Sequence, residues 1–254
     1  MDKNEVIING ISYPATLWHY TDIDGFKQIM TPGAWLYGTH YRFFSDPQEG
    51  VYSEELPHTS PFVICFTTRG DEKKLWNKWK NKTFCIGFSY KALFEAAQYI
   101  FLSEVLKNEK DKVLLKFNDI RLYEVFYSDS PQDAYNEFIA KKAKDTNIQK
   151  SILRKNYFLR YKRKSFSNER EWRIVRNYDH IPQNQVEWIA DKPRLPLFPI
   201  NHACMITNII HKAKDNKNAA IYNDFVNKSC ERLGIRPVIN QTRYCVITGE
   251  GSAK

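Results

Sequence analysis

The sequence lacks the patterns that mark several large classes of protein. No apolar run approaches the length of a membrane span, and the N-terminal segment MDKNEVIING lacks the apolar stretch of a secretory signal. The metal and nucleotide patterns C-x-x-C, H-E-x-x-H, Walker and G-x-G-x-x-G do not occur. We therefore expect a cytoplasmic protein that uses neither a membrane anchor nor a metal ion.

Cysteine is present, but in no paired pattern. The five cysteines form a scattered set of odd number: Cys65, Cys85, Cys204, Cys230 and Cys245. Most lie in apolar segments such as VICF and TFCIGF, where a free buried thiol is the usual state. The pattern predicts free buried thiols in a reducing compartment.

The composition allows a substantial hydrophobic core. The chain has 254 residues, of which 43% are hydrophobic and 15% aromatic. Because no repeat, low-complexity tract or Gly/Ser linker divides it, we predict one domain over residues 1–254. The expected strands come in runs and do not alternate cleanly with helices. That order favours an α+β fold with a mixed or antiparallel sheet and flanking helices.

The expected elements follow from side-chain spacing and turn signals. Strands are predicted at residues 15–20, 34–38, 61–68, 84–89, 120–128, 171–176, 186–190, 204–211, 236–240 and 244–248. Helices are predicted at residues 22–30 and 90–107, after Asp71, from Ser130 to about Tyr161 (continuous or broken), and at 217–233. In the helix after Ser130 the inward side chains are expected to be Tyr135, Phe138, Ile139, Ile148, Ile152 and Leu153. A long loop at 39–60 and a Pro-rich turn, KPRLPLFPI, complete the prediction.

Positive charge is concentrated in one segment. The chain carries a net charge of +9. Residues 141–176 hold 13 Lys+Arg and 3 Asp+Glu, so this segment carries +10 and the remainder −1. A basic stripe with interleaved aromatic residues is typical of a single-stranded nucleic-acid interface. The predicted contacts are Arg154, Lys155, Arg160, Tyr161, Lys162, Arg163 and Lys164. The alternative is an ordinary solvated helix face.

A pair of glutamates follows the basic run. In a strand, alternate residues share a face, so Glu169, Glu171 and Arg173 are expected to point one way and Trp172 the other. Two adjacent carboxylates suit chemistry at a sugar carbon, and the basic surroundings suit an anionic substrate. The alternative is a pair of solvent-facing carboxylates, paired with neighbouring arginines on a charge-protected edge strand.

An ordered series of short motifs extends over nearly the whole chain. It runs from His19-Tyr20-Thr21 through Asp46-Pro47-x-Glu49 to Glu169-x-Glu171-Trp172-Arg173. The series resembles a widespread bacterial family of unknown function marked by an HYT start, an NDP-x-E loop and an E-x-E-W-R strand. Ser45 stands where that family usually has Asn. The family in turn is similar to the ADP-ribosyltransferase fold, including the DarT-like toxins that modify DNA.

This resemblance implies roles for particular residues and implies NAD as co-substrate. Glu171 would stabilise the positive charge that develops on the ribose as nicotinamide leaves, and Glu169 would orient or deprotonate the acceptor. Arg42 is the candidate for an essential arginine that meets the pyrophosphate. His19 and Thr21 would hold a ribose hydroxyl. The other expected contacts of NAD are Tyr20, which alternates to the opposite face, and the aromatic candidates Tyr41, Phe44 and Tyr161.

The resemblance and the basic segment together predict the acceptor. They favour an NAD-dependent toxin that modifies single-stranded nucleic acid, RNA before DNA, with a possible antitoxin partner and a place in phage defence. A protein acceptor remains open. So does a catalytically inactive nucleic-acid-binding module. A third alternative is a nuclease that uses Asp46, Glu49 and a metal ion.

Overall fold

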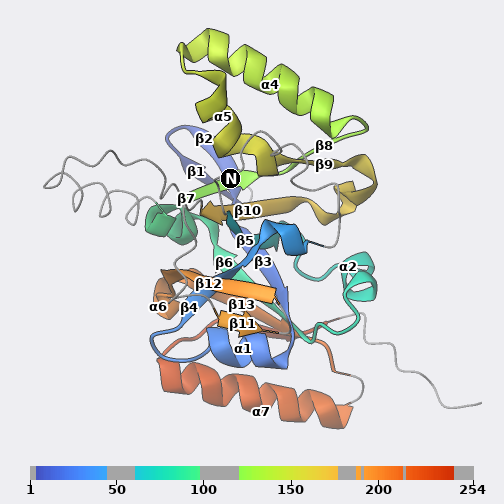
Figure 1. The fold of residues 1–254 in the computed structure, drawn as a ribbon. Helices are drawn as coiled ribbons and strands as arrows, with labels where there is room; N and C mark the ends of the chain where they lie inside the picture. The colour runs from blue at the N-terminus through green and yellow to red at the C-terminus, as the bar shows by residue number, and fades with distance from the viewer. Residues whose placement is uncertain are drawn as a thin grey trace, which may run out of the picture. The chain divides into compact units, whose positions relative to one another are not determined.

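The computed structural model describes residues 4–44, 61–97, 120–176, 187–189, 192–213 and 216–242. The chain forms two compact units (Figure 1). Unit 1 comprises residues 1–34, 67–92 and 200–254, and unit 2 comprises residues 35–66 and 93–199. Helices and a mixed multi-stranded sheet confirm the α+β class. The expected single domain stays a prediction.

Four strands of unit 1 belong to a mixed sheet, and two others form a separate hairpin. Its elements are β1 (Glu5–Ile8), β2 (Ile11–Pro14), β3 (Thr16–Thr21), α1 (Ile23–Ile29), α2 (Lys73–Lys78), β6 (Phe84–Ser89), α6 (His202–Met205), β13 (Ile206–His211), α7 (Asn216–Leu233) and β14 (Val238–Gln241). Residues 90–97 are also helical, and the first three of them belong to this unit. The sheet order is β3-β6-β13-β14, in which only β13 and β14 run parallel. β1 and β2 pair with each other.

The two faces of β6 pack against different helices. Phe84 stacks on Phe26 of α1 at 4.1 Å between ring centroids and lies near Phe225 of α7. The next residue, Cys85, faces the opposite side and clusters with Leu75 and Trp76 of α2. The sheet of unit 1 is therefore covered by α1 and α7 on one face and by α2 on the other.

Local signals account for the boundaries of α1. The side chain of Asp22 accepts a hydrogen bond from the Gly25 N–H, so it forms the predicted N-cap. The helix ends at Ile29, and Gly33 beyond it has a φ of 72°, in the left-handed region that favours glycine.

Unit 2 contains a predominantly antiparallel sheet and a small parallel pair. Its elements are β4 (Trp35–His40), η1 (Tyr41–Phe43), β5 (Phe62–Thr67), β7 (Ile120–Glu124), β8 (Phe126–Ser128), α4 (Pro131–Thr146), α5 (Lys150–Tyr157), η4 (Phe158–Arg160), β9 (Tyr161–Arg163), η5 (Lys164–Glu169), β10 (Glu171–Arg176), β11 (Glu187–Ile189) and β12 (Lys192–Pro199), where η denotes a 3-10 helix and the last residue of β5 belongs to unit 1. The order is β11-β12-β4-β5, with β10 paired to β5 and β7 paired to β10. β8 and β9 form the parallel pair.

The helices of unit 2 cover β8 and β9 through an aromatic-rich core. Tyr135, Ile139 and Leu153 are buried there together with Tyr161 and Val175. α4 begins at Pro131 as predicted and ends at Asn147, whose φ of 53° breaks the helix before α5. In Figure 1, α4 lies next to β8 and β9, and α5 packs against α4.

Several details of the sequence prediction were wrong. The strand expected over 204–211 begins only at Ile206, because His202–Met205 form helix α6. KPRLPLFPI is strand β12, not a turn, and its prolines are accommodated at a register irregularity between Pro196 and Phe198. Glu72, not Asp71, caps α2. Ile148 is 42% exposed because it follows the break at the end of α4. The strand expected over 120–128 is divided into β7 and β8.

Some predicted features lie on residues that the structure does not describe. The acidic loop with Asp46 and Glu49, the strand at 244–248 and Cys245 lie outside the described residues. Cys85 and Cys230 are buried as predicted, but Cys65 and Cys204 are exposed. No helix in the described parts of the chain combines the length and the apolar character that a membrane crossing requires.

Candidate functional site

The two glutamates come together through a turn rather than along a strand. Glu169 is the last residue of η5, and β10 begins at Glu171. Arg170 between them has a φ of 41°, a left-handed conformation that ends η5 before β10 begins. The predicted alternation over Glu169 was therefore wrong in its backbone. The two carboxylates nevertheless meet, as expected.

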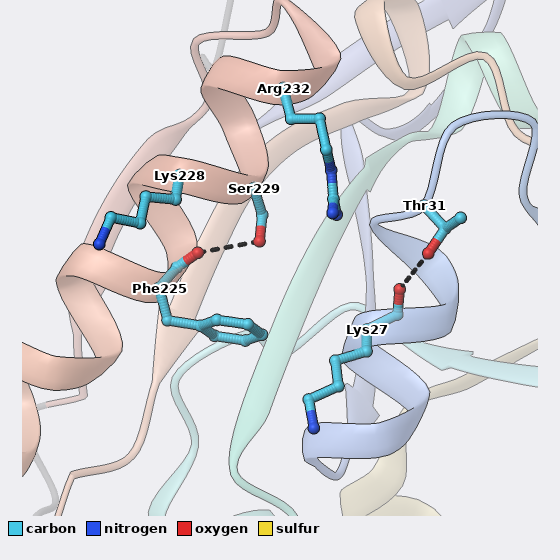
Figure 2. Close-up of a pocket in the computed structure, with 6 residues that line it drawn as sticks. All are labelled: Lys27, Thr31, Phe225, Lys228, Ser229 and Arg232. Carbon is cyan, nitrogen blue, oxygen red and sulfur yellow. Dashed lines mark hydrogen bonds between the residues drawn. The ribbon is translucent and has the colours of Figure 1, made fainter.

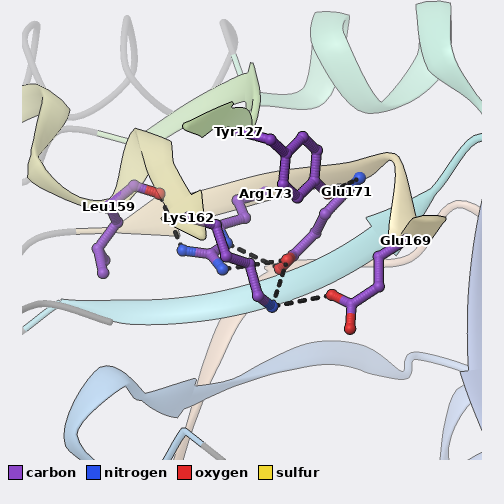
Figure 3. Close-up of polar contacts among 6 residues, drawn as sticks. All are labelled: Tyr127, Leu159, Lys162, Glu169, Glu171 and Arg173. Carbon is purple, nitrogen blue, oxygen red and sulfur yellow. Dashed lines mark hydrogen bonds and ion pairs between the residues drawn. The ribbon is translucent and has the colours of Figure 1, made fainter. Parts of the chain in front are cut away.

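One ammonium group holds both carboxylates (Figure 3). Lys162 of β9 donates from Nζ to Glu169 Oε2 at 2.8 Å and to Glu171 Oε2 at 3.0 Å. All three side chains are almost completely buried, with exposed fractions of 8% for Lys162, 7% for Glu169 and 5% for Glu171. In a segment rich in surface charge, these three residues form part of the interior.

Arg173 contacts Glu171 through two nitrogens. Its Nε donates to Glu171 Oε1 at 2.7 Å and its Nη2 donates to Oε2 at 3.1 Å. Nη1 donates to the carbonyl of Leu159 at 2.9 Å, and the guanidinium lies 5.2 Å from the ring centroid of Phe44. The exposed fraction of Arg173 is 0%, so this planar fork is fixed on every side.

The electrostatics of the cluster favour an ionised Glu171. Burial alone would raise the pKa of this carboxyl group. The adjacent charges of Arg173 and Lys162, with the hydrogen bonds from Arg173 and Cys65, outweigh burial and lower the pKa to about 2. Two carboxylates and two cations balance in charge, which is the condition under which buried ions are tolerated.

The burial and pairing of β10 rule out the alternative in which the two glutamates face solvent on an edge strand. The carboxylates are not solvent-facing, and β10 is not an edge strand, because it pairs with both β5 and β7. Arg173 is indeed a partner of Glu171, as that alternative expected. The pairing is internal, however, and so it gives no protection to a sheet edge.

Two further residues complete the surroundings of Glu171. Tyr127 Oη accepts a hydrogen bond of 2.8 Å from the Glu171 N–H, and the thiol of Cys65 also hydrogen-bonds the Glu171 carboxylate. Neither residue stood out in the sequence. Cys65 is the one outward residue of the otherwise buried strand β5. Its position in the middle of an apolar run concealed that orientation.

The basic segment divides between interior and surface. Lys162 and Tyr161 are buried, so they do not belong to the exposed stripe that the sequence predicted. Arg160 is half-buried, with its guanidinium 4.4 Å from the ring centroid of Phe126. Arg163 is half-buried against Phe166, and Lys164 is exposed and paired with Asp129. Arg154 is half-buried on α5, and Lys155 lies beside it on the same helix.

Of the predicted NAD contacts in unit 2, only Arg42 is exposed. Tyr41 is buried in the core, and the guanidinium of Arg42 lies 6.0 Å from its ring centroid. Phe44 is half-buried under Arg173. The neighbouring His40 is buried; burial and, secondarily, the charge of Arg42 lower its pKa to about 4.

His19, Tyr20 and Thr21 lie on β3 of unit 1. The register opposite β6 confirms the predicted alternation, with His19 and Thr21 on the Phe84 face and Tyr20 on the Cys85 face. Tyr20 is buried in the core between Trp76 and Trp79, and its hydroxyl donates to the carbonyl of Gly70. Tyr20 is therefore a core residue in this structure. Thr21 is buried, with its hydroxyl oxygen closely covered by Gly25.

A cavity of about 370 Å³ lies between α1 and α7 of unit 1 (Figure 2). Its lining residues are Lys27, Thr31, Phe225, Lys228, Ser229 and Arg232. Lys27 pairs with Asp24, Lys228 pairs with Asp224, and Arg232 donates to the carbonyl of Met30 at the end of α1. The polar groups of this cavity are thus compensated by the two helices themselves, and it is the weaker candidate site.

Metal ligation is not evident among the residues that the structure describes. No group of three or more His, Cys, Asp or Glu side chains there is placed to hold a metal ion. The nuclease alternative depends on Asp46 and Glu49, which lie outside those residues.

Comparison with known proteins gives one match. Residues 75–174 match a family described as "Protein of unknown function (DUF2971)". This range begins in α2, ends in β10 and includes Lys162, Glu169 and Glu171. No curated protein and no solved structure matches the chain. The similarity to a family of unknown function is confirmed over this range, and the expected relation to ADP-ribosyltransferases stays a prediction.

Proposed function

We propose that this chain is an NAD-dependent mono-ADP-ribosyltransferase that modifies single-stranded nucleic acid, with RNA favoured over DNA. The observation that carries the proposal is the convergence of Glu169 and Glu171 on one ammonium group inside unit 2. Two carboxylates held by a turn and a strand supply two roles in transfer from a sugar carbon. One anion faces the sugar, and the other faces the acceptor.

Glu171 fits the first role. Its pKa of about 2 keeps it anionic at neutral pH, so it serves as a fixed negative charge and hydrogen-bond acceptor rather than as an acid. NAD would supply an ADP-ribose unit on a nicotinamide leaving group, which departs with the electron pair of the broken bond. A preorganised anion stabilises the charge that develops on the sugar, and its loss typically costs about 100- to 1000-fold in turnover.

Glu169 fits the second role. It ends η5 on the far side of Lys162 from Arg173 and accepts a hydrogen bond from Lys162 Nζ at 2.8 Å. A carboxylate in that position orients the nucleophile of the acceptor or receives the proton that it loses. Arg42 is exposed and keeps the assignment of a pyrophosphate contact. The assignment of His19 as a ribose contact stays a prediction from the sequence.

An aromatic and basic surface of unit 2 supports a nucleic-acid acceptor. Phe126 is 40% exposed, and the Arg160 guanidinium lies 4.4 Å from its ring centroid and 5.8 Å from that of Tyr157. Arg121 lies 5.6 Å from the Tyr157 ring centroid. Alternating guanidinium groups and rings are a platform on which unpaired bases stack. We place the acceptor strand here, with Arg154, Lys155, Arg163 and Lys164 as further phosphate contacts.

This surface predicts salt-dependent binding. Affinity for single-stranded RNA should fall steeply as salt concentration rises, because each phosphate contact releases counterions. Phe126→Ala should weaken binding by about 1–3 kcal/mol without changing the salt dependence, since it removes stacking only. Lys164→Gln should reduce the slope. Binding that is insensitive to both salt and Phe126→Ala would contradict this acceptor.

The biological setting belongs to the same proposal. A transferase that modifies nucleic acid harms its own cell unless it is restrained. We therefore propose a toxin that is held silent by an antitoxin protein and serves in phage defence. Coexpression with a candidate antitoxin should restore growth that the wild-type chain suppresses. Cells that express Glu171→Gln should grow without the antitoxin.

A second candidate is a catalytically inactive nucleic-acid-binding module. The observation that favours it is the occupancy of Glu171, whose oxygens already accept from Arg173 and Lys162. A carboxylate in that state serves the fold without touching any substrate.

One experiment separates the two functions. Wild-type protein and Glu171→Gln are incubated with labelled NAD and, separately, with total RNA, single-stranded DNA and cell protein. Label that appears on RNA with the wild type only supports the proposal, and label on DNA or protein identifies a different acceptor. Glu231→Gln, which changes an exposed glutamate of α7, is the matched control. Absence of both label and released nicotinamide would leave the inactive binding module.

A further inference from the structure

Glu171 has little capacity left for a ligand. Arg173 Nε occupies Oε1, and Arg173 Nη2 and Lys162 Nζ occupy Oε2. Cys65 supplies a further hydrogen bond. A carboxylate accepts about four hydrogen bonds in all. A ribose hydroxyl that binds Glu171 must therefore take the place of a donor that is already present.

Arg173 is poorly suited to give up its hydrogen bonds to Glu171 when a ligand binds. It is completely buried, and all its contacts would be lost together, including the bond to the Leu159 carbonyl and the packing on Phe44. Its bidentate geometry to Glu171 would also be lost. The planar fork is pre-organised for this arrangement, so it serves as a permanent support of the carboxylate.

Lys162 is better suited to give up its hydrogen bond to Glu171. Its ammonium is a single point on a flexible stem, and it contacts Glu171 through one hydrogen bond of 3.0 Å. Its second partner, Glu169, lies at the shorter distance of 2.8 Å, and the ring centroid of Phe166 lies 4.8 Å from Nζ. When Lys162 gives up Glu171, its charge therefore stays compensated inside the same cluster.

We propose that Lys162 is a displaceable internal cation that reserves the ligand position on Glu171 Oε2. A sugar hydroxyl takes this position by displacing the ammonium, which keeps its hydrogen bond to Glu169. The exchange replaces one hydrogen bond by another, and Lys162 keeps its proton. Lys162 is thus a positioning residue that acts through the two glutamates. This inference rests on the function proposed above, because it names the ligand as the ribose of NAD.

Displacement of Lys162 predicts how KM for NAD changes when residue 162 is substituted. A guanidinium at position 162 spans both carboxylates with two donors each and is harder to displace, whereas a thioether offers no competition at all. Lys162→Arg should therefore raise KM for NAD by about tenfold, with kcat within about threefold of the wild type. Lys162→Met should lower KM, although it also lowers Tm, because it leaves two carboxylates with one cation.

The experiment measures initial rates of nicotinamide release against NAD concentration, together with Tm, for the wild type, Lys162→Arg and Lys162→Met. Lys73→Met, which changes an exposed lysine of α2, is the control and should match the wild type. Opposite shifts of KM in the two variants support the inference. If Lys162→Met does not fold, the result with Lys162→Arg decides.

Two other outcomes overturn the inference, and they differ in what they say of the proposed function. An active wild type whose KM is unchanged in Lys162→Arg, with changes in Tm only, makes Lys162 a structural ion-pair partner and leaves the transferase intact. A wild type that releases no nicotinamide, with or without an acceptor, removes the proposed function and this inference together.

Discussion

Units 1 and 2 both bury polar side chains, and they compensate them by different means. In unit 1 the Tyr20 hydroxyl donates to the backbone carbonyl of Gly70, and the surrounding Cys85 and Trp76 are uncharged. In unit 2 four charged groups, Lys162, Glu169, Glu171 and Arg173, compensate one another. A neutral cluster tolerates the loss of one partner better than an ionic one, because no unpaired charge remains.

The ionic cluster is expected to respond most strongly to the loss of a cation. Arg173→Met removes one of the two cations of this cluster and should lower the free energy of unfolding by about 3–5 kcal/mol. Urea denaturation at pH 7 measures this change. Arg170→Met is the control, because Arg170 is exposed and its loss should cost little. A loss below about 1 kcal/mol for Arg173→Met would mean that the cluster relaxes or hydrates.

The same cluster should make unit 2 sensitive to acid. Glu171 has a pKa of about 2 in the fold, below its ordinary value of 4.5. Its stabilising contribution is therefore fully present above pH 4.5 and is lost as the pH falls from 4.5 through 2. Tm measured against pH should decline over this window in the wild type. The part due to Glu171 should be missing in Glu171→Gln. Parallel curves for the two proteins would contradict this assignment.

The neutral cluster should show a smaller effect. Tyr20→Phe removes one hydroxyl and leaves the Gly70 carbonyl without that donor, which should cost about 1–3 kcal/mol in the free energy of unfolding. The cost should be the same at every pH between the acid window and neutrality, because burial raises the pKa of the Tyr20 hydroxyl above its ordinary value of 10.0 and the Gly70 carbonyl does not titrate. Tyr222→Phe, which changes a half-buried tyrosine of the same unit, is the control. A pH-dependent cost would remove the contrast between the two clusters.

The smallest expected effect concerns the pKa of His40, a buried neutral side chain that is influenced by a neighbouring charge. It is buried as a neutral base, and burial and the charge of Arg42 hold its pKa at about 4. Since Arg42 is the second cause, Arg42→Gln should raise the pKa of His40 part of the way toward its ordinary value of 6.5. Titration of the ring protons by NMR measures this. An unchanged pKa would assign the whole effect to burial.

Much of the fold was predictable because its signals are local. The cap at Asp22 and the alternation along β3 were expected, and β6 and β10 have the predicted boundaries. Errors arose where tertiary packing outweighed local preference. β12 forms in spite of its prolines because it pairs with both β4 and β11. Ile148 is exposed although its spacing is that of a buried helical residue.

The candidate site shows the same division. The sequence by itself determined that Glu169 and Glu171 lie together, since two residues apart is close in any backbone conformation. It also determined the basic segment beside them. Only the tertiary structure decided that Lys162 enters the interior between the carboxylates, and that Cys65 and Tyr127 reach Glu171 from β5 and β8. These partners are separated from Glu171 along the chain, so local spacing could not predict them. Burial makes a charged side chain depend on an opposite charge, because a buried ion without a partner is strongly destabilising.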